Sequence, residues 1–131
     1  MADPPPVQML LPGFTVRQLP LDLTNVNGVL FFAADDGTDG GVELWKSDGT
    51  AAGTVLVRDI DPGPNPSNPR VLLSLGNIVL FNASTRTSGA ELWRTDGTDV
   101  GTTMVRDLCV GTCSALPPLA LTAFGGRAYF Q

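Results

Sequence analysis

The stretch Glu43–Thr50, which reads Glu-Leu-Trp-Lys-Ser-Asp-Gly-Thr, decides how this chain is organised because it occurs twice. The second copy, Glu91–Thr98, reads Glu-Leu-Trp-Arg-Thr-Asp-Gly-Thr and begins 48 residues later. The two copies contain both tryptophans and both glutamates of the protein. A motif that returns at a fixed interval indicates a repeat architecture, and an interval of about 40–50 residues is typical of a four-stranded propeller blade.

The repeat extends on both sides of this motif. Downstream, Ala52–Ile60 matches Val100–Leu108 at the same spacing of 48. Upstream, Leu30–Phe32 matches Val79–Phe81 and then Ala128–Phe130 at a spacing of 49. The extra residue falls in the loop before the first motif, and an insertion in a loop leaves the flanking strands unchanged.

Each unit is predicted to contain four short strands, because runs rich in Val, Leu, Phe and Thr alternate with Gly, Pro and Asp. The strands predicted for the first unit are Leu21–Val26, Gly28–Ala34, Val42–Ser47 and Thr54–Ile60. The nearly continuous apolar character of Gly28–Ala34 predicts burial on both faces. The predicted fold class is therefore all-β, with propeller-type blades of four antiparallel strands and about 2.5 repeats per chain.

The repeat boundaries divide the chain into four predicted segments. These are residues 1–19, which hold the last strand of a preceding blade, 20–68 (blade 1), 69–117 (blade 2) and 118–131 (partial blade 3). The strand fragment is predicted at Val7–Gly13, which aligns with Val57–Gly63. Because closed propellers have about four or more blades, we expect the blades to be completed by oligomerisation or to belong to a longer array.

The third and fourth strands of each unit should form a hairpin. The predicted cross-strand pairs are Ser47–Thr54, Trp45–Leu56, Glu43–Arg58 and, in the second unit, Glu91–Arg106. An ion pair across two strands stabilises a sheet by roughly 0.2–1 kcal/mol. This interpretation is favoured over a catalytic one because each glutamate has a cation in its own unit and no second carboxylate in the motif.

The tryptophans and turn aspartates of the motif are the candidate ligand-binding residues: Trp45, Trp93, Asp48 and Asp96. Each tryptophan could pack between blades with its N–H bonded to a carbonyl, or could form a sugar-stacking platform that recurs once per unit. Each aspartate precedes a glycine in a tight turn, where its carboxylate can accept backbone N–H groups. A carbohydrate or cation contact at these turns is the alternative.

Asp35, Asp36 and Asp39 lie in a Gly-rich loop that resembles a calcium loop, since hard cations bind several carboxylate oxygens. The matching loop of the second unit, Ser84–Gly89, contains no acidic residue. A site present in one copy only is a weak signal, so calcium binding stays an open alternative. No catalytic residue, metal site or cofactor is predicted.

Cys109 and Cys113 are the two cysteines of the chain. They align with Asp61 and Asn65, which form the turn of the previous connector. A disulfide would close the same turn covalently, and three intervening residues allow the two sulfurs to meet. We therefore predict a disulfide and an oxidising compartment.

Composition excludes several classes of function. The net charge of −5 argues against nucleic acid and anionic membranes as partners, because both require a basic patch. The chain has no apolar run near the roughly 18 residues that a membrane helix needs. It contains no histidine, which removes Ser–His and Cys–His nucleophile pairs.

The motif resembles the bacterial ELWxxDGT repeat family. The resemblance rests on Glu-Leu-Trp-x-x-Asp-Gly-Thr, then Ala-Gly-Thr, then Val-Arg-Asp-Ile and Pro-Gly, and it covers nearly the whole chain from Val7. It implies secreted or cell-surface bacterial proteins whose tandem repeats form β-propellers. It implies no enzymatic activity and no defined ligand, and this chain departs from it in being short and in carrying two cysteines in one connector.

The expected function is a non-catalytic extracellular scaffold of lectin or adhesin type that binds glycan or protein, where repeated pockets add by avidity. The alternative is a structural protein that assembles into a closed oligomer or a filament, because an exposed terminal strand is a template for pairing with another chain. An enzyme is the least favoured class, because the acids lie within the repeat and histidine is absent.

Overall fold

The computed structural model of the chain describes residues 21–38, 40–107, 110–111 and 121–130. Every regular element in these ranges is a β-strand, and all strand pairs are antiparallel. Within the same ranges, no helix long and apolar enough to cross a membrane is found. The predicted all-β class is therefore confirmed.

The strands form two four-stranded sheets and one hairpin. Sheet 1 contains β1 (Leu21–Val26), β2 (Val29–Asp35), β3 (Val42–Ser47) and β4 (Val55–Arg58) in that spatial order. Sheet 2 repeats the order with β5 (Arg70–Leu75), β6 (Ile78–Thr85), β7 (Gly89–Thr95) and β8 (Thr103–Arg106). The hairpin consists of β9 (Leu121–Phe124) and β10 (Arg127–Phe130).

The strand boundaries follow local sequence signals closely. Asn27 and Gly28 connect β1 to β2 with positive φ angles of 52° and 85°, which is the backbone that a two-residue hairpin turn requires. The prediction of Thr54–Ile60 as the fourth strand was too long, since β4 spans only Val55–Arg58. The predicted fragment at Val7–Gly13 lies outside the described residues.

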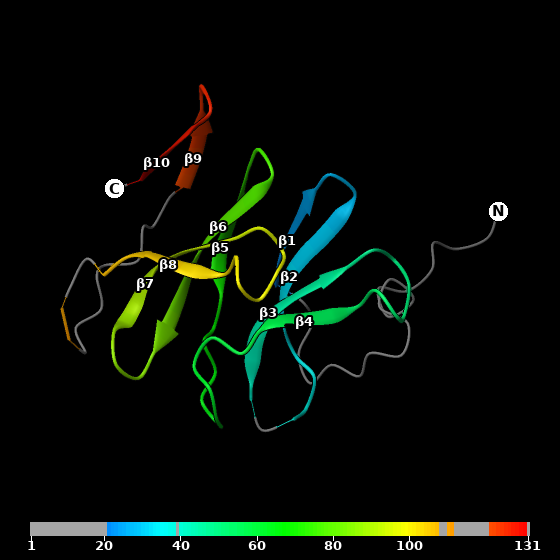
Figure 1. Cartoon of the computed structure of the whole chain (residues 1–131), viewed down its shortest axis with the longest axis vertical. Helices are drawn as coiled ribbons and strands as arrows, with labels where there is room; N and C mark the ends of the chain where they lie inside the picture. Colours follow the sequence, from blue (N-terminus) through cyan, green and yellow to red (C-terminus); the bar gives the residue numbers. More distant parts are fainter. Residues whose placement is uncertain (1–20, 39, 108–109, 112–120, 131) are drawn as a thin grey trace.

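The sheets stack in chain order, so that β1 contacts β5 and β5 contacts β9 (Figure 1). The described strands do not close into a ring, and the division of the chain into blades stays a prediction. The main hydrophobic core lies between the two four-stranded sheets. It combines Phe31, Leu44 and Val57 of sheet 1 with Phe81 and Trp93 of sheet 2.

Strand β2 is buried on both faces, as its sequence predicts. Phe31 points to the core between the sheets and is 4% exposed, whereas Phe32 points to the opposite face and is 0% exposed. Successive side chains of a strand alternate between faces, so the second face of sheet 1 must be covered independently of sheet 2. Phe32 and Ala34 form a separate small cluster there, against which Leu30 and Trp45 pack.

A β-bulge in the β3–β4 pairing overturns one predicted ion pair in each unit. Trp45 faces Leu56 as predicted, but Arg58 faces Leu44 rather than Glu43. The extra residue of the bulge is Val57, and such an insertion moves every later side chain of the strand to the other face. Arg58 is therefore on the face that points to sheet 2, while Glu43 is on the face that points away.

The second unit contains the same bulge. Trp93 faces Met104, and Leu92 faces Arg106. The predicted pairing of Glu91 with Arg106 is therefore wrong for the same geometric reason.

Candidate functional site

A pocket of about 500 Å³ opens on the face of sheet 1 that points away from sheet 2. Its described lining consists of Asp36, Thr38, Gly40, Gly41, Glu43, Trp45, Leu56, Asp59, Gly63 and Pro64. The loop between β2 and β3 supplies one wall, and the end of β4 with the following connector supplies the other. Three of these residues are acidic and none is basic, so the pocket favours neutral or cationic ligands over anionic ones.

Glu43 is held at this pocket by bonds to the connector between the two sheets. One carboxylate oxygen accepts the Ser67 amide at 2.8 Å, and the other accepts the Ser67 hydroxyl at 2.5 Å. The amide of Ile60 also donates to this carboxylate. Burial raises the pKa of Glu43 to about 7, against the opposing effect of these donors, because loss of hydration disfavours the charged form.

Asp59 is the second acid near Glu43. Its charge also raises the pKa of Glu43, and both residues line the pocket. The Oδ1 atom of Asp59 is buried, and it has no hydrogen-bond partner among the described residues. A buried acceptor without a donor is costly, and Asp59 is also one of the residues that line the pocket.

The two motif tryptophans lie in different surroundings. Trp45 is half-buried, packs against Phe32 and lines the pocket. Trp93 is 7% exposed and lies within the core between the sheets. The carbonyl partner expected for the indole N–H is not found for Trp93 in the described part of the chain, because its ring is surrounded by apolar side chains.

The acidic loop before β3 satisfies its own carboxylates. Asp35 Oδ1 accepts the Gly37 amide at 2.8 Å, and Asp36 Oδ1 accepts the amide and hydroxyl of Thr38 at 2.9 and 2.6 Å. No group of three or more His, Cys, Asp or Glu residues able to hold a metal ion is found among the described residues. Asp39 lies outside them.

The Asp-Gly-Thr turn of the motif is closed by hydrogen bonds within itself. Asp48 Oδ1 accepts the amide of Thr50 at 2.9 Å and its hydroxyl at 2.6 Å, and the Thr50 hydroxyl accepts the amide of Gly53 at 2.9 Å. The hydroxyls of Ser47 and Thr54 are 2.7 Å apart, which confirms that these two residues face each other. The Thr50 hydroxyl and amide hold the pKa of Asp48 below its usual value.

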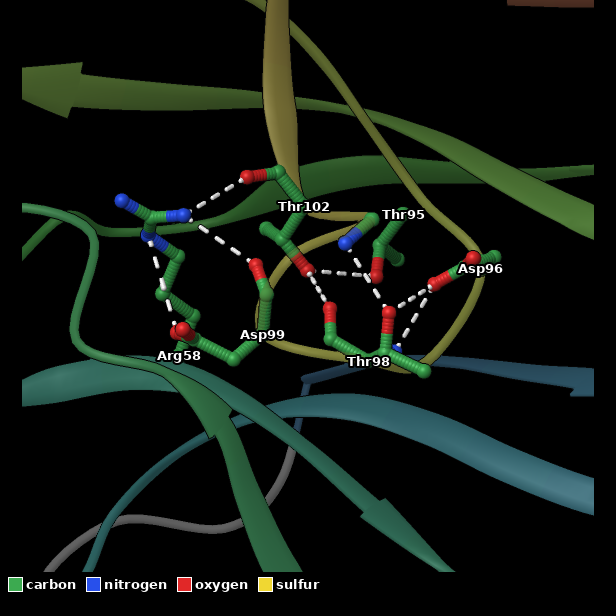
Figure 2. Close-up of polar contacts among 7 residues, drawn as sticks. Arg58, Thr95, Asp96, Thr98, Asp99 and Thr102 are labelled. Carbon is green, nitrogen blue, oxygen red and sulfur yellow. Dashed lines mark hydrogen bonds and ion pairs between the residues drawn. The ribbon is translucent and has the colours of Figure 1, made fainter.

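The second turn reproduces the first (Figure 2). Asp96 Oδ1 accepts the amide and hydroxyl of Thr98 at 2.9 and 2.6 Å, and the hydroxyls of Thr95 and Thr102 are 2.7 Å apart. The Thr98 hydroxyl and amide likewise lower the pKa of Asp96. These bonds give both aspartates a structural role, and neither aspartate lines the pocket beside Trp45. Ligand binding by Asp48 or Asp96 stays a prediction.

Sheet 1 holds the second turn through two cations. Arg58 Nη1 donates to the carbonyl oxygens of Asp99 and Thr102, both at 3.1 Å (Figure 2). Lys46 Nζ donates to the carbonyl oxygen of Gly97 at 2.6 Å. The bulge that separates Arg58 from Glu43 therefore makes this arginine part of the contact between the sheets.

Several pocket residues were not found from the sequence. Asp59 could have been found, because it recurs as Asp107 in the repeated Val-Arg-Asp segment. Ser67 and Pro64 gave no such signal, since they belong to a connector whose path depends on the packing of the sheets. Cys109 and Cys113, the residues of the predicted disulfide, both lie outside the described residues.

Comparison with profiles of known protein families, with curated proteins and with solved structures finds no match for this chain.

Proposed function

We propose that this protein is a non-catalytic, extracellular β-propeller-type repeat module that binds a neutral or amino sugar in the pocket beside Trp45. The observation that carries the proposal is a pocket whose lining combines the ring of Trp45 with the acidic residues Asp36, Glu43 and Asp59. A sugar has the two kinds of surface that this lining matches. Its C–H groups stack on an aromatic ring, and its hydroxyls donate to carboxylates.

The size and charge of the pocket support this class of ligand. A volume of about 500 Å³ is within the usual range for small-molecule sites, and it suits one or two sugar rings. Asp36, Glu43 and Asp59 line the pocket without a basic residue. Sialylated or sulfated glycans would be repelled by these acids, whereas a neutral or amino sugar would not.

A binding role is favoured over catalysis by the hydrogen bonds of Glu43. Both of its oxygens already accept donors from Ser67, and the Ile60 amide adds a third. A general acid must present its proton to the substrate, whereas this carboxyl faces the connector. Glu43 is therefore assigned to holding the pocket wall.

The extracellular bacterial location and the repeat family belong to the same proposal. They rest on the repeated motif Glu-Leu-Trp-x-x-Asp-Gly-Thr and on the predicted pairing of Cys109 with Cys113. Mass spectrometry of the periplasmically expressed chain, with and without reductant, tests the disulfide. A mass two hydrogens below the reduced chain is expected, and two free thiols would contradict the oxidising compartment.

The binding proposal is tested on a glycan array, followed by isothermal titration with chitobiose and with sialyllactose. We expect binding to neutral or amino-sugar glycans and none to sialyllactose. Trp45→Ala and Asp59→Asn should each weaken binding by roughly tenfold or more, with an unchanged circular dichroism spectrum.

The matched control is Asp107→Asn, which alters the counterpart of Asp59 in the second unit. This variant should bind chitobiose as the unaltered protein does. No binding to any neutral or amino-sugar glycan would contradict the proposal, as would an equal loss in Asp59→Asn and Asp107→Asn.

A further inference from the structure

The turns β1–β2 and β5–β6 hold equivalent places in the two units but carry asparagine at different positions. The first turn is Asn27-Gly28 and the second is Gly76-Asn77, and each joins two antiparallel strands through two residues. Both turns project from the same end of the stacked sheets (Figure 1). Asn27 and Asn77 are both exposed, so the chain presents two asparagines to solvent in matched settings.

Asparagine is a thermolabile residue, and its lability depends on the residue that follows it. The backbone nitrogen of that residue can attack the side-chain carbonyl carbon. A C–N bond then forms, the proton of this nitrogen goes to the departing amino group, and ammonia leaves a cyclic imide. Water opens the imide at either carbonyl, which gives aspartate or isoaspartate. The conversion consumes water alone and needs no oxidant or reductant.

The residue after the asparagine distinguishes the two turns. Among the asparagines of the sequence, only Asn27 precedes a glycine. Gly28 has no Cβ to hinder its nitrogen, and no atom lies within 4 Å of the position that a Cβ would occupy. Asn77 precedes Ile78, whose branched Cβ crowds the corresponding nitrogen. Asn27 is therefore the reactive member of the pair.

Two hydrogen bonds restrain this reaction in the folded chain. The Nδ2 atom of Asn27 donates to Asn77 Oδ1 at 2.8 Å, which ties the side chain to sheet 2. The amide of Gly28, the attacking group, donates to Asn25 Oδ1 at 2.9 Å. Both bonds lie on the exposed surface, where water competes for the same groups. They should slow the attack without preventing it.

We propose that Asn27 is a modification site at which spontaneous deamidation forms aspartate or isoaspartate, at a rate controlled by its hydrogen bond to Asn77. The carboxylate product has no N–H to donate, so this bond between the sheets is lost in its present form. Isoaspartate also lengthens the backbone of a turn that is built from two residues. The change falls on a crevice of about 280 Å³ between the sheets, whose lining includes Asn27, Asn77, Lys46 and Asp96.

The test follows deamidation of the whole chain in heavy-oxygen water at mildly alkaline pH. Digestion in ordinary water and fragmentation of the peptides then assign each labelled acid to one residue. We expect labelled acid at Asn27 to accumulate several-fold faster than at Asn77. A synthetic peptide of residues 21–30, which lacks the contact with sheet 2, should convert faster still.

Two variants at position 77 test the control of the rate. Asn77→Ala removes the acceptor, and it suits the turn because the positive φ of 61° belongs to Gly76. Deamidation at Asn27 should become several-fold faster, towards the rate of the peptide. Asn77→Asp keeps an acceptor oxygen and is the matched control, so it should deamidate at the rate of the unaltered chain. Circular dichroism should show the same fold in both variants.

Two results would overturn the assignment of the site: conversion at Asn77 as fast as at Asn27, or no conversion at Asn27 while the peptide converts. Both are read from the unaltered chain, so they do not depend on the folding of a variant. Equal rates in Asn77→Ala and Asn77→Asp would overturn the control by Asn77.

Discussion

The two copies of the motif have the same turn but different surroundings. In both turns the aspartate accepts the threonine amide at 2.9 Å and its hydroxyl at 2.6 Å. Yet Thr102 is fully buried at 0% exposure, whereas its counterpart Thr54 is only partly buried. Trp93 lies in the core between the sheets, and Trp45 lines an open pocket.

This difference separates what the motif determines locally from what its neighbour determines. The turn forms from bonds among residues a few positions apart, so both copies build it identically. The burial of each tryptophan depends on which sheet covers that face, and only the second copy has sheet 1 against it. The tryptophan of the motif is thus a pocket residue in the first unit and a core residue in the second.

The largest expected difference between the units is the cost of removing each tryptophan. Trp93→Ala should destabilise the fold by about 3–5 kcal/mol, as removal of a large buried side chain does. Trp45→Ala should cost about half of that, because its ring is partly solvated. Guanidinium unfolding followed by circular dichroism measures both, and equal losses would show that the two rings are equally buried.

The pH dependence of stability should come from the pocket of the first unit. Glu43 has a pKa of about 7 in the folded chain against 4.5 as its ordinary value, so the folded state binds more protons between these two pH values. The contribution of Glu43 to the free energy of unfolding should therefore be greatest below about pH 4.5. It should fall as the pH rises through 7, by at most about 3 kcal/mol.

Glu43→Gln is the variant that isolates this contribution, since the amide does not titrate. Urea unfolding at several pH values between 4.5 and 8 should give a flatter profile for Glu43→Gln than for the unaltered chain. An identical slope in both proteins would remove Glu43 as the source.

The glycine that follows each Asp-Gly-Thr turn is required by a close approach. A Cβ at Gly53 would lie 1.9 Å from Asp48 Oδ1, and one at Gly101 would lie 2.0 Å from Asp96 Oδ1. Alanine at either position should displace the carboxylate from its threonine and lower the melting temperature, because the turn loses both hydrogen bonds from the threonine. Thermal unfolding measures the loss, which should be larger for Gly101, where the turn is packed against sheet 1.

A double-mutant cycle tests the cause of that loss. In an Asp96→Ala background, Gly101→Ala should cost little, because no carboxylate remains for the Cβ to displace. Additive losses would point to another contact of Gly101.

The smallest expected effect concerns the cations of the two units. Arg58→Ala removes two hydrogen bonds to the second turn and should cost about 1 kcal/mol, since the side chain is partly exposed. Arg106→Ala alters an exposed arginine and should leave the stability of the isolated chain unchanged. Chemical unfolding of the two variants side by side checks this, and equal losses would contradict the assignment of Arg58 to the contact between the sheets.

Much of the fold could be predicted from the sequence because its signals are local. The strands β1 and β3 have the predicted boundaries, and the doubly buried apolar run became β2. The predicted pairing of Glu43 with Arg58 was wrong because the bulge at Val57 cannot be recognised from the alternation of apolar and polar residues along the strand. An extra residue there changes the face of every later side chain.

The candidate site was predictable only in part. Trp45 could be singled out from the motif, but its difference from Trp93 depends on the order in which the sheets stack, which two nearly identical motifs do not encode. Asp59 recurs in the repeat and could have been considered, whereas the role of Ser67 depends on the path of the connector across β3.

Acrylamide quenching of the two single-tryptophan variants tests the central claim most directly, namely that one motif yields an accessible ring in the first unit and a core ring in the second. Trp93→Phe retains Trp45, and Trp45→Phe retains Trp93. We predict a Stern–Volmer constant several-fold larger for the chain that retains Trp45, on the scale of the difference between a partly solvated and a buried side chain. Equal constants, or a larger one for the chain that retains Trp93, would contradict the account.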